Sequence, residues 1–276
     1  MTAAEPLSGV ARTALGVARM RAAEQARPDR LFDDPYAQAF VDAAPDTLPR
    51  HLPAPGSLPE LMAFQAVVRT RFYDDYLLAS CGEGGRRQVV LLAAGLDTRA
   101  YRLPWPDGVR LYEVDLPEIF AFKEGLLAGV HAAPSCTRFV CPADLRGDWP
   151  RGLIEAGFSP DEPTVWLLEG LLIYLDAARA AALLTTVGVL SAPGSRLSAE
   201  SGDNVGWLRE KAREVPTLAR AASLWKGGLG DGTAGWLERH GWRTEPHTLA
   251  AVAGSYGRPA PDGVRSGFLT ATWAPD

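Results

Sequence analysis

The chain has 276 residues, of which 47% are hydrophobic, so it is long enough for one large domain with a sizeable core. Its 28 Lys and Arg and 33 Asp and Glu give a formal net charge of −5, and no block of consecutive basic residues stands out, which excludes the electrostatic pattern of a nucleic-acid-binding protein. Three cysteines form no CxxC pair, which argues against a disulfide framework or a zinc site and favours a reducing, cytoplasmic compartment. We therefore expect a small-molecule partner, no nucleic acid and no metal.

The N-terminal part of the chain is predicted to form helices. Residues 9–27, GVARTALGVARMRAAEQAR, place apolar side chains on one helical face, but their arginines exclude both a signal peptide and a membrane span, so no membrane partner is expected. A second short helix is predicted over residues 33–44. Ser57 and Glu60 have the spacing of a capping box, which predicts a longer helix that ends at the glycines of residues 81–85.

From residue 88 onward, short β-rich runs alternate with segments long enough to be helices. Because parallel strands need long crossover connections, this alternation predicts an α/β fold with a doubly wound, mostly parallel sheet. The last two runs are expected to pair antiparallel across a loop over residues 248–265. We expect a single domain (1–276) in which a helical lid (1–80) covers an α/β core (81–276). The predicted strands cover residues 88–94, 109–115, 137–144, 164–170, 194–201, 242–247 and 266–273.

The residues that end the predicted strands indicate where a ligand binds, because ligands of doubly wound sheets lie beyond the carboxyl ends of the strands. The first strand ends in Gly95, where the backbone can approach a ligand closely. Asp115 ends the second strand and follows Gly95 by 20 residues, the spacing at which a carboxylate accepts hydrogen bonds from both ribose hydroxyls of an adenosine cofactor. Asp144 and Glu169 end the third and fourth strands. Any one acid could merely cap a helix, but four agreeing strand ends favour a site.

The glycine pattern after the first strand is weak. A dinucleotide-binding loop needs glycines in the order G-x-G-x-x-G, whereas this turn holds Ala93 and Gly95 and no third glycine. A pyrophosphate cradle is therefore poorly supported, and an adenosine cofactor without a pyrophosphate fits better. A nicotinamide-dependent oxidoreductase and a cofactor-fold binding protein without turnover remain as alternatives.

Five motifs follow one another along the chain: RTRFYDDYL (69–77), AAGLDTRAYRL (93–103), YEVDLP (112–117), ADLRGDW (143–149) and EGLLIYL (169–175). In this order they resemble the leucine carboxyl methyltransferase family, in particular its bacterial branch of S-adenosylmethionine-dependent O-methyltransferases, some of which act in polyketide tailoring. The resemblance implies the Rossmann-like fold of a class I methyltransferase, with one antiparallel strand in a seven-stranded sheet. It also implies S-adenosylmethionine as the cofactor.

The resemblance further implies which positions bind the methionine part of the cofactor. Arg69 would hold its carboxylate, Gly95 would pass beneath it, and Glu169 would face its amino group. Ala93 stands where the family commonly has glycine, and its methyl group fits if the backbone stays in the β region.

Arg71 is a rival for the role of Arg69, since both residues lie shortly before the first strand. Either arginine could instead pair with Asp74 or Asp75 on a helix surface, where such pairs contribute about a few tenths of a kcal/mol. This alternative stays open.

The resemblance places the adenosine at the ends of the second and third strands. Asp115, with Leu116 beside it, would bind the ribose, and Asp144 and Leu145 would flank the adenine. Tyr174 would lie near the sulfonium, although a core aromatic is the alternative for this residue.

We expect the acceptor to be a carboxylate of a small molecule, such as a polyketide or another secondary metabolite. A phenol has a pKa near about 10 and needs a base to lose its proton at neutral pH, whereas a carboxylate is already an anion. The five motifs contain no histidine, and His247 is the only plausible base by position. A phenolic or alcoholic hydroxyl acceptor is the alternative, and the oligomeric state stays open.

Overall fold

Seven strands form where short apolar and β-branched runs predict them. The structure is a computed structural model that describes residues 11–44, 54, 56–82, 85–202, 205–262 and 266–275. The sheet has the strand order β3-β2-β1-β4-β5-β7-β6. Its strands are β1 (Gln88–Leu92), β2 (Arg110–Asp115), β3 (Thr137–Pro142), β4 (Thr164–Leu168), β5 (Arg196–Ser201), β6 (Trp242–Thr248) and β7 (Gly267–Trp273).

The pairing confirms a mostly parallel sheet with one antiparallel strand. β1 pairs in parallel with β2 and β4, β2 with β3, and β4 with β5. β7 runs antiparallel to both of its neighbours, β5 and β6. Every residue of β1 and of β4 is buried, as expected of central parallel strands covered on both faces.

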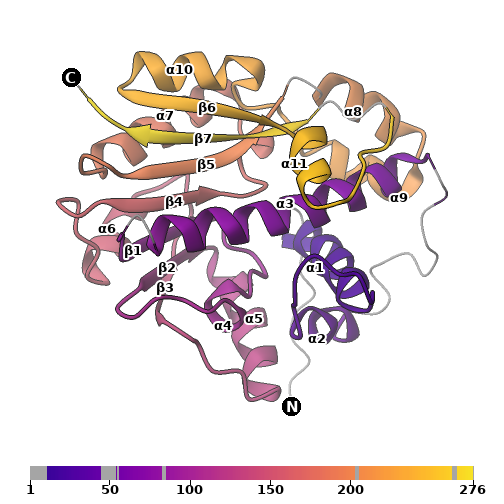
Figure 1. The fold of residues 1–276 in the computed structure, drawn as a ribbon, viewed down its shortest axis with the longest axis horizontal. Helices are drawn as coiled ribbons and strands as arrows, with labels where there is room; N and C mark the ends of the chain where they lie inside the picture. The colour runs from indigo at the N-terminus through magenta and orange to yellow at the C-terminus, as the bar shows by residue number, and fades with distance from the viewer. Residues whose placement is uncertain are drawn as a thin grey trace.

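Helices cover both faces of this sheet (Figure 1). One apolar cluster joins α3, α4 and α11 to the face that carries Val89 and Leu111, and a second joins α6, α7 and α10 to the face that carries Val90 and Trp166. The helices of these two layers are α3 (Leu58–Cys81), α4 (Arg99–Arg102), α6 (Trp149–Glu155), α7 (Ala177–Val189), α10 (Thr233–Arg239) and α11 (Leu249–Ser255).

Of the remaining helices, α5 packs beside β3, and α1, α2, α8 and α9 lie around the edge where the parallel strands end. α1, α2 and α5 share a small apolar cluster that includes Leu15, Phe40 and Leu127. α8 and α9 pack with Trp225 against Leu58, at the start of α3. Figure 1 shows α1, α8 and α9 gathered at this end of the sheet. Their bounds are α1 (Ala11–Gln25), α2 (Ala37–Asp42), α5 (Pro117–Gly129), α8 (Val205–Arg213) and α9 (Pro216–Ala222), with short 3-10 turns η2 (Leu172–Tyr174) and η3 (Gly230–Gly232).

Two local expectations need correction. The expected loop over residues 248–265 contains α11, because the Thr248 hydroxyl caps the helix by accepting a hydrogen bond from the backbone N–H of Ala251 at 3.3 Å. At the start of α3, Ser57 accepts from the N–H of Glu60 as the capping box predicts, but the Glu60 carboxylate accepts from Gly56 instead of Ser57.

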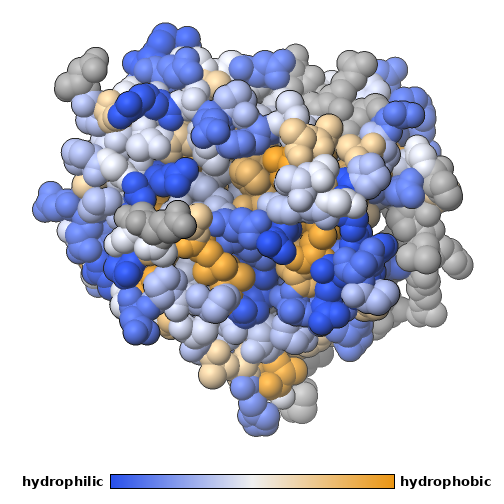
Figure 2. All heavy atoms as spheres, in the orientation of Figure 1, coloured by the Kyte–Doolittle hydropathy of each residue, from blue (hydrophilic) through white to orange (hydrophobic). Residues whose placement is uncertain are grey.

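The face of the molecule seen in Figure 2 carries its apolar residues in small areas separated by polar side chains. Within the part of the chain that the structure describes, no helix is both long enough and apolar enough to cross a membrane. The same residues contain no group of three or more His, Cys, Asp and Glu arranged to hold a metal ion.

Candidate active site

The turn after β1 lies next to the end of β2. The predicted first strand stops at Leu92, since Ala93 has a φ of +56° and Gly95 a φ of +53°. The condition under which the methyl group of Ala93 would fit, a backbone in the β region, is therefore not met. The chain turns sharply at this point instead of continuing the strand, and it holds an alanine in the left-handed region that favours glycine.

Asp115 fixes this turn through its carboxylate. Its Oδ2 accepts a hydrogen bond from the N–H of Gly95 at 2.6 Å, and its Oδ1 accepts from the N–H of Leu116 at 2.7 Å. Burial raises the pKa of Asp115, and the two backbone N–H groups offset part of that rise. Because each carboxylate oxygen has a second lone pair, Asp115 can still accept from the two hydroxyls of a ribose.

The next strand end brings Asp144 and Leu145 to the same edge. The N–H of Ala143 donates to the backbone oxygen of Asp115 at 2.8 Å, so the loop after β3 begins beside this residue. The Asp144 carboxylate accepts from the backbone N–H of Arg146 at 2.9 Å and pairs with its guanidinium. Leu145 is half-buried against the core. The adenine-flanking role of Asp144 and Leu145 stays a prediction.

Arg69 of α3 lies between two carboxylates at the ends of β4 and β5. Its Nε lies 2.9 Å from Oε1 of Glu169, and its Nη1 donates to Oε1 of Glu200 at 2.9 Å. Burial opposes the charge of Arg69, but Glu169 and Glu200 outweigh it and raise the pKa of the guanidinium. The side chain is 13% exposed, and Nη2 has no hydrogen-bond acceptor among the described residues. This edge of the guanidinium is available to an anionic ligand.

Further ion pairs extend this arrangement into the protein. Nη1 of Arg99 donates to Oε2 of Glu169 at 2.7 Å and also pairs with Asp97, while its Nε donates to Oδ1 of Asp74 at 2.7 Å. Arg102 donates hydrogen bonds to both carboxylate oxygens of Asp74, from Nη1 at 2.6 Å and from Nη2 at 2.7 Å. We call this set the ionic cluster, and its members are Arg69, Asp74, Asp97, Arg99, Arg102, Glu169 and Glu200. The charged residues after the Gly95 turn, Asp97 and Arg99, are thus buried and paired, as charges must be in an apolar interior, whereas the buried Thr98 hydroxyl has no hydrogen-bond partner among the described residues.

The structure separates Arg69 from its rival. Arg71 donates from Nε to Asp75 at 2.9 Å and from Nη1 to the backbone oxygen of Leu31 at 2.8 Å, and it lies over the ring of Tyr256. Arg71 therefore forms a surface ion pair within its own helix, with Asp75, whereas Arg69 belongs to the ionic cluster.

Helix α1 lies over the Gly95 turn. A Cβ atom placed on Gly95 would lie 3.6 Å from the Cβ of Ala14, so the helix and the turn are in close contact. Tyr174 donates a hydrogen bond to the hydroxyl of Thr13 at 3.2 Å, and Arg21 donates to the backbone oxygen of Leu96 at 2.6 Å. Tyr174 is thus a half-buried contact of α1 near the ends of the strands. That residues 1–80 act as a helical lid over the site stays a prediction.

His247 lies on the edge strand β6, away from the ionic cluster. Its Nε2 is 3.0 Å from the hydroxyl of Thr270, and its ring lies 5.3 Å from that of Phe72. In the described part of the chain, none of its contacts is with a member of the cluster. The structure therefore does not bring the candidate base to the other predicted site residues.

Glu200 is a site residue that the sequence reasoning missed. It is the last residue but one of β5, so the signal that selected Asp115, Asp144 and Glu169, an acid at the end of a strand, applies to it equally.

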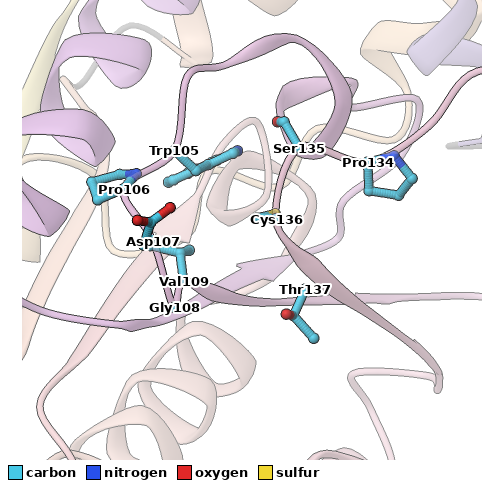
Figure 3. A pocket seen from close by; sticks show the side chains of 9 residues that line it. All are labelled: Trp105, Pro106, Asp107, Gly108, Val109, Pro134, Ser135, Cys136 and Thr137. Carbon is cyan, nitrogen blue, oxygen red and sulfur yellow. The ribbon is translucent and has the colours of Figure 1, made fainter.

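A pocket of about 300 Å³ opens at the opposite edge of the sheet (Figure 3). Val109 and Cys136, which line it, directly precede β2 and β3, so the pocket lies at the amino ends of these strands. It therefore does not belong to the strand-end site.

The described residues fit S-adenosylmethionine in three respects. Asp115 offers acceptors for a ribose diol, the free edge of Arg69 suits a carboxylate, and the left-handed turn at Gly95 brings backbone next to Asp115. The ionic cluster contains four carboxylates and three guanidinium groups, so it also suits a ligand that carries an ammonium group.

Comparison with known proteins supports this assignment. The family described as leucine carboxyl methyltransferase matches residues 14–188, more than half of the chain. A relative from Frankia alni is 51% identical over 269 residues, which cover 96% of this chain and 95% of that protein. A relative from Streptomyces coelicolor is 46% identical over 257 residues, which cover 91% and 89% of the two chains. The names of both relatives assign them to the S-adenosyl-L-methionine-dependent methyltransferases.

Two solved structures share the fold. A DUF574 family protein from Streptomyces avermitilis has a TM-score of 0.58 and 15% identity, covering 92% of this chain and 96% of its own. A protein from Thermobifida fusca has a TM-score of 0.55 and 20% identity, covering 93% and 94%. These likenesses concern the fold alone, which is that of the class I methyltransferases. The family match over residues 14–188 and the two relatives show more than the fold. The chain belongs to the leucine carboxyl methyltransferase family.

Proposed function

We propose that this protein transfers a methyl group from S-adenosylmethionine to a carboxylate oxygen of a small-molecule acceptor and so forms a methyl ester. The observation that carries the choice of acceptor is the absence of a free base among the described residues of the site. Glu169, Glu200 and Asp97 are engaged by guanidinium groups, Asp115 is held by two backbone N–H groups and is assigned to the ribose, and His247 lies on the edge strand. An acceptor that is already an anion needs no base.

The names of the relatives and the family support S-adenosylmethionine as the methyl donor. When bound, this cofactor supplies a methyl group that its sulfonium already activates. Arg69 and Glu169 would hold its amino-acid part, and Asp115 its ribose. The main task of the chain is then to hold the acceptor oxygen in line with the methyl group, and such orientation contributes roughly 7–11 kcal/mol. Helix α1, which contacts Gly95 and Tyr174, would exclude water from the site.

A carboxylate is also the group that the family description names. The resemblance to polyketide-tailoring members supports a polyketide or another secondary metabolite as its carrier. A hydroxyl acceptor would need a positioned base, and the His247 ring contacts Thr270 and Phe72 rather than the ionic cluster.

The test uses aromatic acids that carry both groups, so that one molecule offers the enzyme a choice. The protein is incubated with methyl-labelled S-adenosylmethionine and a panel of hydroxybenzoic acids, including 6-methylsalicylic acid, and the labelled products are treated with mild alkali. We expect label that alkali releases as methanol, because esters saponify and aryl ethers do not. An alkali-stable product whose formation is abolished by His247→Ala would overturn the carboxylate assignment in favour of a phenol.

A further inference from the structure

Glu200 is a member of the ionic cluster to which the family resemblance assigns no role. Both of its oxygens accept hydrogen bonds from the N–H of Gly170, at 2.9 and 3.0 Å, and Oε1 also accepts from Nη1 of Arg69 at 2.9 Å. The carboxylate therefore ties α3 to the turn that follows β4. Arg69 and Glu200 are 131 positions apart in the sequence, so this connection forms only in the folded chain.

These contacts restrain the plane of the Arg69 guanidinium. Glu200 accepts a hydrogen bond from Nη1, and Oε1 of Glu169 lies 2.9 Å from Nε, at ion-pair distance without forming a hydrogen bond to it. The hydrogen bond to Glu200 therefore restrains one end of the rigid planar group, and the charge of Glu169 attracts it at a second atom. The remaining nitrogen, Nη2, has no acceptor among the described residues and forms the edge that a carboxylate of a ligand can reach.

The same carboxylate also holds the turn from which Glu169 projects. Gly170 has a φ of +64°, and a Cβ atom placed on it would lie 3.6 Å from Nη1 of Arg69. The bonds from its N–H to Glu200 fasten this left-handed turn against the guanidinium. A single side chain of β5 thus contacts both Arg69 and the backbone next to Glu169.

We propose that Glu200 is a positioning residue that orients Arg69 for the carboxylate of S-adenosylmethionine. It acts through Arg69, while its bonds to the N–H of Gly170 hold its own carboxylate in place. The inference rests on the cofactor of the proposed function and is independent of the acceptor.

The test compares two ligands that differ in one group. Decarboxylated S-adenosylmethionine keeps the sulfonium, the ammonium and the adenosine and lacks only the carboxylate. Calorimetry measures the Kd of both ligands for the wild type and for Glu200→Gln, with Glu200→Asp as a second variant that keeps the charge and shortens the reach. We expect Glu200→Gln to raise the Kd of S-adenosylmethionine by about tenfold or more, the scale of a lost hydrogen bond to a charged group. The Kd of the decarboxylated ligand should change by less than about twofold.

A matched control is Glu162→Gln, which also removes a carboxylate paired with an arginine, Arg110, but at the amino ends of the strands. It should leave both Kd values unchanged. In an Arg69→Ala background, Glu200→Gln should cause no further loss for S-adenosylmethionine, because its effect passes through Arg69.

Three results would overturn the inference alone: an unchanged affinity of Glu200→Gln for S-adenosylmethionine, an equal loss for both ligands, or a full loss that persists in the Arg69→Ala background. A wild-type protein that binds neither ligand would contradict the proposed function as well, so the two failures are distinguishable.

Discussion

Replacing Arg69 by lysine keeps the charge and removes the planar fork. The guanidinium contacts Glu169 and Glu200 with two different nitrogens and leaves a third for a ligand. A lysine has one nitrogen at the end of a flexible chain, so it cannot span both carboxylates and present a fixed edge. Hydrogen bonds to charged groups contribute about 1.5–3 kcal/mol each, so losing one to the cofactor carboxylate should raise the Kd of S-adenosylmethionine by roughly 10-fold to 150-fold.

The control for this prediction lies two residues further along the same helix. Arg71 is 40% exposed and pairs with Asp75, so Arg71→Lys should lower the free energy of unfolding by about 0.5 kcal/mol or less. It should change the Kd of S-adenosylmethionine by less than about threefold. Titration calorimetry with S-adenosylmethionine measures both variants, and thermal unfolding confirms that each is folded. If Arg69→Lys binds as tightly as the wild type while Arg71→Lys binds weakly, the assignment of Arg69 is refuted and moves by two residues.

Two further predictions concern Asp115 and Asp97. Asp115→Ala should weaken S-adenosylmethionine binding by about 1.5–3 kcal/mol, because it removes acceptors for the ribose, and an unchanged Kd in calorimetry would remove this residue from the site. Burial by itself would raise the pKa of Asp97, but the positive charges of Arg99, Lys123, Arg102 and Arg21 together outweigh it and lower the pKa from its ordinary 3.8 to about 2. Because the pKa of Asp97 is lower in the folded chain than in the unfolded chain, its ionised carboxylate stabilises the fold at pH values above 3.8, and this contribution is lost as the pH falls toward 2. The difference in the free energy of unfolding between the wild type and Asp97→Asn should therefore shrink by about 2 kcal/mol between pH 5 and pH 2. Urea unfolding at several pH values measures this difference, and a constant value would contradict the assigned ion pair.

The sequence by itself determined the sheet and the edge at which the site lies. β1 and β4 are short apolar runs followed by turns, and only strands buried on both faces need such runs. Crossover-length segments between them required parallel pairing, and parallel strands bring their carboxyl ends to one edge. The sequence alone therefore predicts that Gly95 and Asp115 lie side by side, and the Asp115 carboxylate indeed accepts a hydrogen bond from the N–H of Gly95.

The tertiary structure decided which side chains face this edge. Arg69 and Arg71 are about 200° apart around a helix of 3.6 residues per turn, and only the packing of α3 on the sheet determines which of them points inward. His247 was a candidate by its position in a strand, but the order of the strands places β6 at the outer edge. The φ of Ala93 likewise depends on how the chain leaves β1 to pass beside Asp115.

The ionic cluster is the clearest case of what only the fold could decide. Its members come from α3, the Gly95 turn, α4, and the ends of β4 and β5, and no local pattern links Arg69 to Glu200. Charges buried at such a junction persist only when each meets an opposite charge, and that pairing exists only once the strands and helices are assembled.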